Sequence, residues 1–327
     1  MAEVHFTDDA LTKAKGKVIV LTGGAQGIGG SFVKIAYTAG AHLFVGDWDV
    51  EKGEALAASL RADKEASANG GTVTFQRVDV TNYKSQLALF EAAVAAHGHI
   101  DTAVPFAAGG EPRGFFEPET LTIESLQAEP TAIRDRLELN VLSVVYFCRI
   151  ALAYMRNPDP DAAQRAYDAK EPMPKSIVLI ASLAGIAQNP GVPIYITSKH
   201  AVMGLLRSFA PYAPVRYNVR INAMCPSATN TRMIDSLTES WVAAGLPMNQ
   251  PEDVARYVLL CATDEQRNGN AIYISGGKGV DIEDGYVKTM PVWMGLQHTI
   301  DLQASREFCG LGDGWVETKT SWQEKKE

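Results

Sequence analysis

Cysteine is scarce in this sequence, and the few cysteines are widely separated. Four occur in 327 residues, and none has Cys-x-x-Cys spacing or a histidine at metal-ligand spacing. The pattern therefore predicts neither a disulfide framework nor a bound metal. We expect these side chains to be small buried groups in a protein of a reducing compartment.

Positive charge and long apolar runs are also in short supply. The 30 basic residues are outnumbered by 38 acidic ones, which gives a net charge of −8. Binding along a nucleic-acid backbone needs a basic face, so we expect no nucleic-acid partner. No run of 18 apolar residues occurs. Residues 1–17 lack an apolar signal core, so we expect no membrane partner and a cytoplasmic protein.

What the sequence does contain is a regular alternation of apolar runs and helical patterns that starts at Lys17. Short β-branched runs without polar alternation are typical of strands covered on both faces. We therefore predict an α/β fold, a single Rossmann-like doubly wound seven-stranded parallel sheet with helices on both faces. The expected strands are residues 18–21, 41–45, 72–78, 100–107, 176–181, 219–223 and 271–274.

Segments outside this repeat define the expected domain organisation. We expect an N-terminal extension (1–16), a catalytic domain (17–284) and a C-terminal extension (285–327). Residues 157–175 are polar and proline-rich, which predicts a surface insertion after a long helix over 132–155. Residues from about 227 to 249 predict a substrate lid, whose apolar members are Met233, Trp241, Leu246 and Met248. They favour a lipophilic or aromatic substrate, and ordinary helix-face core is the alternative.

A glycine-rich turn, Thr22-Gly23-Gly24-Ala25-Gln26-Gly27-Ile28-Gly29, directly follows the first strand and opens a helix. Glycines let the backbone approach a pyrophosphate, and free amides at a helix N-terminus attract its charge, so the turn predicts a dinucleotide site. A merely structural turn is the alternative.

Two aspartates end the second and third expected strands. Asp47 can accept hydrogen bonds from both hydroxyls of an adenosine ribose and repel a 2′-phosphate, which favours NAD over NADP. The alternative is that Asp47 begins a turn with Asp49. Asp79, followed by Val80, can hold the adenine edge or can likewise begin a turn.

A phenol and an ammonium lie four residues apart, at Tyr195 and Lys199, and therefore on one face of an expected helix. The ammonium favours the phenolate, which would let Tyr195 act as a general base below its usual pKa of about 10. Ser182 follows the fifth strand, where its hydroxyl can hydrogen-bond a reacting oxygen. Asn140, within the long helix, can hold a water of a proton relay or can bond a neighbouring backbone group.

Together these motifs resemble those of the short-chain dehydrogenase/reductase family, in order and approximate spacing, over about 17–284. Within the family they are similar to NAD-dependent 15-hydroxyprostaglandin dehydrogenases and to fungal enzymes that act on polyketide alcohols. The resemblance implies four catalytic roles: Tyr195 as base, Lys199 lowering its pKa and binding the nicotinamide ribose, Ser182 orienting the substrate, and Asn140 anchoring the relay. The residues that we expect to contact the cofactor, from the motifs above or from the resemblance, are Gly23, Gln26, Gly27, Ile28, Gly29, Asp47, Asp79, Val80, Ala108, Gly109, Tyr195, Lys199, Pro226 and Thr231.

The resemblance implies an NAD(H)-dependent oxidoreductase that interconverts a secondary alcohol and a ketone. An NADPH-linked ketoreductase and a nucleotide-binding protein without redox activity are the alternatives. The resemblance also implies a homodimer or homotetramer formed through the helices that bear Asn140 and Tyr195.

Two departures from the family's motifs affect the cofactor pocket. Phe106-Ala107-Ala108-Gly109 stands where the family usually has Asn-Asn-Ala-Gly, and Ser227 replaces the glycine that commonly follows the position of Pro226.

Overall fold

The computed structural model describes residues 3–6 and 9–311. Its contacts divide the chain into two compact units, Met1–Ile282 and Glu283–Glu327. The first unit contains every site residue predicted above. In the second, α11 (Glu283–Trp293) and α12 (Leu296–Cys309) contact each other, and residues 312–327 of the predicted C-terminal extension lie outside the described residues.

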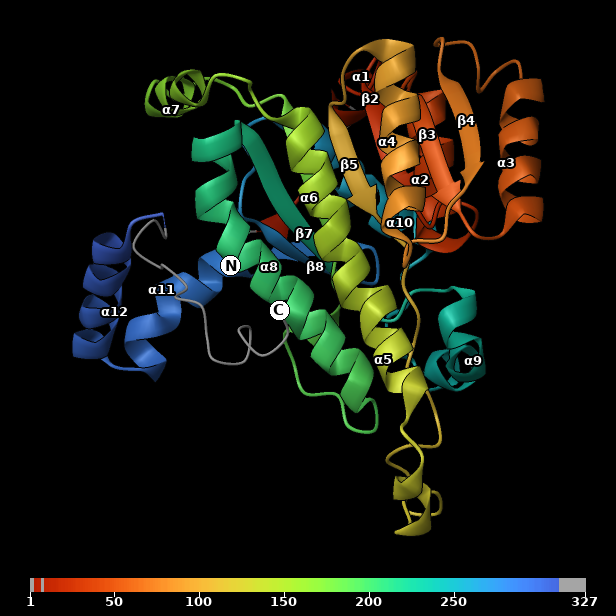
Figure 1. Cartoon of the computed structure of the whole chain (residues 1–327), viewed down its shortest axis with the longest axis vertical. Helices are drawn as coiled ribbons and strands as arrows, with labels where there is room; N and C mark the ends of the chain where they lie inside the picture. Colours follow the sequence, from red (N-terminus) through yellow and green to blue (C-terminus); the bar gives the residue numbers. More distant parts are fainter. Residues whose placement is uncertain (1–2, 7–8, 312–327) are drawn as a thin grey trace, which may run out of the picture. The chain divides into compact units, whose positions relative to one another are not determined.

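The first unit is built on one mixed sheet of nine strands, in the order β1-β9-β8-β7-β6-β5-β2-β3-β4 (Figure 1). The seven predicted parallel strands are confirmed as β2 (Val18–Thr22), β3 (His42–Asp47), β4 (Thr72–Arg77), β5 (Thr102–Pro105), β6 (Lys175–Ile180), β7 (Val219–Pro226) and β8 (Ala271–Ser275). The strand order reverses between β2 and β5, and such a switch point is where a doubly wound sheet binds ligands.

Two further strands correct the predicted count of seven. β9 (Lys278–Asp281) pairs antiparallel with β8, and β1 (Glu3–Val4) pairs antiparallel with β9. Strands of two and four residues are too short to show a periodicity in the sequence, so the pattern gave no signal for this edge.

Helices cover both faces of the sheet, as predicted. On one face α2 (Gly27–Thr38), α3 (Val50–Ala62) and α10 (Pro251–Thr263) share a core cluster, and the short α1 (Asp9–Thr12) packs on α10. On the other face α4 (Tyr83–His97), α6 (Ser143–Met155) and α8 (Pro193–Tyr217) lie side by side over a second cluster (Figure 1). All five residues of β2 are buried between the clusters, which explains its lack of polar alternation.

The long helix predicted over 132–155 is interrupted. It consists of α5 (Thr131–Leu137), a π-helical turn η2 (Glu138–Leu142) and α6. Asn140 lies in this π turn, a feature that is frequent at functional sites. By length and composition the run Thr131–Met155 could cross a membrane, but α6 packs into the core described above.

The segments outside the sheet repeat contain helices of their own. The predicted insertion holds α7 (Pro160–Asp168), which begins where the Asp159 carboxylate accepts a hydrogen bond from the Asp161 amide. The predicted lid holds η4 (Arg232–Ile234) and α9 (Asp235–Ala243). The segment between β5 and α5, yellow in Figure 1, projects away from the sheet and contains η1 (Glu124–Gln127).

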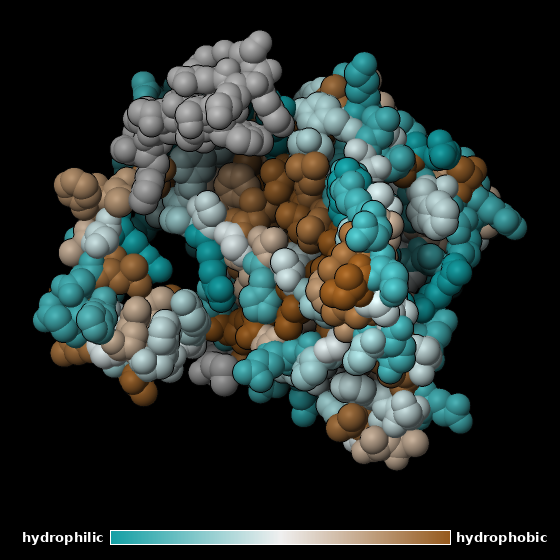
Figure 2. Space-filling model, turned by 60° about the horizontal axis from the view of Figure 1, so that its bottom comes forward, coloured by the Kyte–Doolittle hydropathy of each residue, from teal (hydrophilic) through white to brown (hydrophobic). Residues whose placement is uncertain are grey.

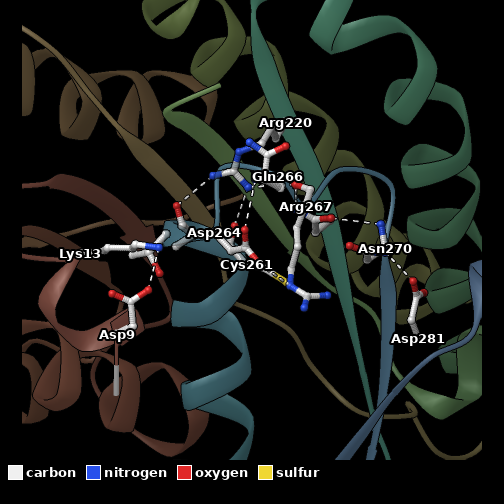
Figure 3. Close-up of polar contacts among 12 residues, drawn as sticks. Asp9, Lys13, Arg220, Cys261, Asp264, Gln266, Arg267, Asn270 and Asp281 are labelled. Carbon is white, nitrogen blue, oxygen red and sulfur yellow. Dashed lines mark hydrogen bonds and ion pairs between the residues drawn. The ribbon is translucent and has the colours of Figure 1, made fainter. Parts of the chain in front are cut away.

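A buried arginine ties the sheet to the end of α10. Arg220 on β7 is fully buried, and Figure 3 shows its guanidinium beside Cys261 and Asp264. It donates hydrogen bonds of 2.7–3.0 Å to four backbone carbonyls, those of Met173, Cys261, Ala262 and Arg267. Burial lowers the pKa of Arg220 to about 10, so the group is charged at neutral pH. Because carbonyls at a helix C-terminus are partly negative, the cation stabilises the end of α10.

Candidate active site

The glycine-rich turn after β2 forms a backbone cradle, residues 22–29, at the switch point of the sheet. Gly23 and Gly27 adopt left-handed φ angles of 73° and 57°. A Cβ on Gly23 would lie 2.5 Å from the Ala107 amide nitrogen, and one on Gly29 would overlap the Gly23 carbonyl oxygen. Gln26 provides no side-chain cap for α2 among the described residues, so the first helical amides are left for an anion. The cradle therefore fits the pyrophosphate of a dinucleotide.

Asp47 fixes this cradle from the end of β3. Its Oδ2 accepts a hydrogen bond from the Ala25 amide at 2.9 Å, and its Oδ1 accepts one from the Asp49 amide at 3.0 Å, which confirms the turn with Asp49. Each carboxylate oxygen can accept a second bond, so the residue also fits ribose hydroxyls. Two cations lie nearby: a hydrogen bond from Lys52 lowers the pKa of Asp49, and Arg232 adds to the lowering. No local pattern in the sequence predicts Arg232 at this point.

Several predicted cofactor residues lie at the same edge of the sheet. Ala108 and Gly109 follow β5, and Pro226 ends β7. The Thr231 methyl group lies 3.5 Å from the position of a Cβ on Gly27, and therefore against the cradle. Phe106, which stands where the family usually has asparagine, packs its ring on Phe32 of α2 with centroids 5.3 Å apart. Apolar packing therefore replaces polar support at the end of β5.

Asp79 and Val80 make local contacts instead. The Asp79 carboxylate accepts hydrogen bonds from the Thr81 amide and hydroxyl at 3.0 and 2.7 Å. The Val80 carbonyl accepts a hydrogen bond from the Gln86 side chain on α4. Of the two roles considered for Asp79, the structure shows the turn, and the adenine contact stays a prediction.

Ser182, Tyr195 and Lys199 meet at the carboxyl end of β6. Ser182 caps the short η3 (Leu183–Gly185) by accepting a hydrogen bond from the Ala184 amide, and its hydroxyl lies close enough to the Tyr195 phenol to lower the pKa of that phenol. Lys199 lies one turn along α8 from Tyr195, with Nζ 5.7 Å from the centre of the phenol ring. The Lys199 ammonium donates to the carbonyl of Ile180, the last residue of β6, at 2.9 Å. The structure thus brings three of the four predicted catalytic residues into one cluster.

Known proteins resemble this chain in sequence and in fold. The family model described as short chain dehydrogenase matches residues 17–241. The short-chain dehydrogenase/reductase ascJ of Acremonium egyptiacum is 30% identical, over 87% of this chain and 86% of its own. The chain belongs to the short-chain dehydrogenase family.

Other members of this family support the assignment. 5'-Hydroxyaverantin dehydrogenase of Dothistroma septosporum is 30% identical, over 86% of this chain and 92% of its own. 15-Hydroxyprostaglandin dehydrogenase (NAD(+)) of Mus musculus is 24% identical, over 82% of this chain and 93% of its own. A short-chain type dehydrogenase/reductase from Mycobacterium ulcerans has the same fold, with a TM-score of 0.67 at 24% identity over 80% of this chain and 90% of that one. The chain is thus an oxidoreductase of a family that uses nicotinamide cofactors.

Burial dominates the protonation of the cluster in this short-chain dehydrogenase. Burial raises the pKa of Tyr195, and the hydrogen bond from Ser182 offsets part of the rise. Burial also lowers the pKa of Lys199 to about 8. The prediction that Lys199 makes the phenol acidic is therefore wrong for the chain by itself, because both charged forms lose hydration in the buried cluster. At neutral pH the chain holds Tyr195 as the phenol and Lys199 as the ammonium.

Asn140 uses its side chain on the backbone. Its Oδ1 accepts a hydrogen bond from the Gly109 amide at 2.8 Å, and its Nδ2 donates to the Gly109 carbonyl at 2.9 Å. The same Nδ2 donates to the Ser198 hydroxyl at 3.1 Å. The bond to a neighbouring backbone group is the role that the structure shows for this side chain. Its part in a water relay stays a prediction.

Two charged residues beside the site were missed in the sequence analysis. Glu111 accepts hydrogen bonds from the backbone amides of Ile194 and Tyr195, at 3.2 and 2.6 Å. The Arg136 guanidinium covers Gly109, and its Nε makes no hydrogen bond within the part of the chain that the structure describes. These contacts gave no sequence signal because the partners of Glu111 lie 83 and 84 residues away.

Proposed function

We propose that this short-chain dehydrogenase interconverts a secondary alcohol and a ketone with NAD(H), with Tyr195 as general acid and base. The observation that carries the proposal is the meeting of Ser182, Tyr195 and Lys199 at the carboxyl end of β6. There the Lys199 ammonium donates to the Ile180 carbonyl, and Ser182 lies close enough to the Tyr195 phenol to lower its pKa. The cluster lies at the edge of the sheet that also bears the glycine cradle. A substrate oxygen bound by Ser182 and Tyr195 would therefore have its carbon near a dinucleotide in the cradle.

Each residue of the site has a distinct part in the reaction. The cofactor, when bound, supplies hydride transfer at its nicotinamide ring. The cradle and Asp47 would hold it. Tyr195 donates a proton to a ketone oxygen as the phenol, and accepts one from an alcohol as the phenolate. Ser182 donates a hydrogen bond to the same oxygen and fixes its position, while the Lys199 ammonium stabilises the phenolate when it forms.

The buried pair of Tyr195 and Lys199 sets the direction that a given pH favours. Because the pKa of Tyr195 is raised and that of Lys199 is lowered to about 8, the pair loses its first proton near pH 8. Below this pH the pair holds both protons and can protonate a ketone oxygen. Above it Lys199 has lost its proton, and the neutral amine can take up the phenol proton as Tyr195 accepts the proton of an alcohol. Acid therefore favours ketone reduction and alkali favours alcohol oxidation.

We assign NAD rather than NADP as the cofactor. The Asp47 carboxylate is buried at the end of β3, where it would repel a 2′-phosphate. The similarity to a prostaglandin dehydrogenase named for NAD(+) supports this choice. Lys52 and Arg232, which lie near Asp49, favour the rival NADPH-linked reductase. Because the Lys52 ammonium is already bonded to Asp49 at 2.7 Å, we give Asp47 the greater weight.

We also propose a lipophilic or aromatic substrate. Within the described part of the lid, α9 buries none of its residues, so ordinary core does not describe it. Met233, Leu237 and Leu246 are each about half exposed, with exposed fractions of 47%, 55% and 46%. Figure 2 shows apolar side chains gathered near the centre of the face turned forward. The relatives named for 5'-hydroxyaverantin and 15-hydroxyprostaglandin support a hydroxylated organic substrate.

A second copy of the chain is the partner that we propose, in a cytoplasmic homodimer or homotetramer. A groove of about 680 Å³ is lined by residues of α5, η2, α6 and α8. Its apolar side chains are Pro130, Ile133, Leu137, Val141, Leu142, Val145 and Ala201. Leu142 and Val145 are each about 40% exposed. A two-fold contact between copies of these helices would bury this apolar surface.

The test follows NADH absorbance with a panel of secondary alcohols and the matching ketones. We expect turnover by the wild type and a loss of about 10²- to 10⁴-fold in Tyr195→Phe, with NADH still bound, because the phenolic proton is gone. Ser182→Ala should lower kcat without abolishing NADH binding. Equal turnover by Tyr195→Phe and the wild type would contradict the acid–base role. Binding of NADH without turnover of any carbonyl would favour a nucleotide-binding protein without redox activity.

A further inference from the structure

Tyr195 is held by its backbone as well as by its phenol. Its amide donates to the Glu111 carboxylate at 2.6 Å, and its carbonyl accepts from the Ser198 hydroxyl at 2.7 Å. Ser198 accepts from Asn140, and Asn140 holds the Gly109 backbone by two hydrogen bonds. Gly109 lies two residues before Glu111. The bonds therefore close a ring through Tyr195, Ser198, Asn140, Gly109 and Glu111.

Glu111 caps the helix that carries Tyr195 from a distant part of the chain. Among the described residues, Val192 at the N-cap position gives α8 no side-chain hydrogen bond, and Pro193 at the first position has no amide hydrogen. The next two amides, those of Ile194 and Tyr195, both donate to the Glu111 carboxylate. A carboxylate is a favourable acceptor here, because the bonds are charge-assisted and the helix N-terminus is partly positive. One side chain thus satisfies the first free amides of α8.

The segment from Gly109, which Asn140 holds, to Glu111, which holds α8, also faces the lid. A Cβ on Gly110 would lie 3.7 Å from the Met233 side chain. The three residues from Gly109 to Glu111 therefore lie between the proposed lid and the start of α8. A substitution at Asn140 or Glu111 would therefore shift this segment relative to the site.

We propose that Glu111 is a positioning residue: with Asn140 it holds the first turn of α8 so that the Tyr195 phenol stays beside Ser182 and Lys199. The inference rests on the proposed acid–base role of Tyr195. Glu111 itself need not touch the substrate. Its effect is geometric, because proton and hydride transfer need the reacting groups aligned, and a displacement of about 1 Å can cost roughly 10²-fold in rate.

Three variants separate positioning from general stability. Glu111→Ala removes both acceptor oxygens, whereas Glu111→Gln keeps one oxygen without the charge. Glu119→Ala is the matched control, because Glu119 is an exposed acidic residue of the same loop. Asn140→Ala, alone and with Glu111→Ala, tests whether the two residues act in one ring.

We expect Glu111→Ala to lower kcat about 10- to 100-fold with little change in NADH affinity, and Glu111→Gln to lie between it and the wild type. The pH profile of alcohol oxidation should shift in Glu111→Ala, because the profile reports the Tyr195–Lys199 pair. The double variant should lose little more than the worse single variant, since either change opens the same ring. Glu119→Ala should match the wild type.

Hydrogen exchange of the peptide that starts α8 tests the ring without any turnover. We expect faster exchange there in Glu111→Ala, with the melting temperature close to that of the wild type. Unchanged kcat and exchange in Glu111→Ala would overturn the inference, as would parallel losses of kcat, NADH affinity and melting temperature. A wild type that turns over no alcohol would defeat the proposed function, while the exchange result would still decide whether Glu111 holds the helix.

Discussion

Replacing Asp47 with alanine separates two effects of its carboxylate. The first is local, because Asp47 accepts hydrogen bonds from the Ala25 and Asp49 amides and so shapes the cradle. The second is electrostatic, because a negative charge at the end of β3 opposes an extra phosphate on the ribose. NADH depends on the cradle and on hydrogen bonds from its ribose hydroxyls to Asp47, whereas NADPH also meets the repulsion.

The structure gives the size of each effect. A hydrogen bond to a charged group contributes about 1.5–3 kcal/mol, and Asp47→Ala would remove such a bond from a ribose hydroxyl of the cofactor. We therefore expect Asp47→Ala to weaken NADH binding by about 2–3 kcal/mol, or roughly 30- to 150-fold. Two unit charges about 4 Å apart repel by about 4 kcal/mol near a protein surface, and removing that repulsion offsets the loss for NADPH. The preference for NADH should therefore largely disappear.

The assay is a fluorescence titration of NADH and NADPH at one ionic strength. Asp49→Ala is the control, because its ion pair with Lys52 is partly exposed and such pairs contribute about 0–1 kcal/mol. We expect this control to bind NADH nearly as the wild type does, and to bind NADPH somewhat more tightly because Lys52 loses its partner. Tighter binding of NADPH by the wild type would refute the reasoning. So would an unchanged ratio of the two affinities in Asp47→Ala.

Three further changes test the cradle, the core and the assembly. Gly29→Ala places a Cβ on the Gly23 carbonyl, so we expect NADH binding to be lost while the circular dichroism spectrum is retained; normal affinity would contradict the cradle. Arg220→Met leaves four buried carbonyls without their donor, and we expect about 3–5 kcal/mol less unfolding free energy in urea; a loss below about 1 kcal/mol would show that these carbonyls find other partners. Val145→Asp puts a charge in the apolar groove, and we expect a monomer by light scattering; an unchanged mass would place the contact elsewhere.

The sheet and the catalytic cluster could be predicted because both depend on local patterns. Buried parallel strands carry continuous apolar runs, and glycine-rich turns and residues after strands point to the edge where ligands bind. The spacing of Tyr195 and Lys199 places them on one helix face whatever lies around them. Ser182 was predictable because it follows a strand of the sheet, at the edge where ligands bind.

The remaining features depend on tertiary contacts. Glu111 meets α8 and Arg232 approaches Asp49 only after the chain has folded, so neither has a local signature. The π turn at Asn140 breaks a helix whose apolar pattern is continuous. The pKa of Tyr195 was predicted with the wrong sign because the sequence showed the ammonium but not the depth of burial. Burial is a property of the packed core, and here it outweighs the nearby charge.

The most direct test of the account measures kcat for alcohol oxidation and for ketone reduction across neutral and alkaline pH. For the wild type, oxidation should rise and reduction should fall through about pH 8, where the Tyr195–Lys199 pair loses its first proton. The residual rates of Tyr195→Phe should show neither change. Flat profiles in the wild type, or the same two changes retained in Tyr195→Phe, would contradict the assignment of Tyr195 as the group that moves the proton.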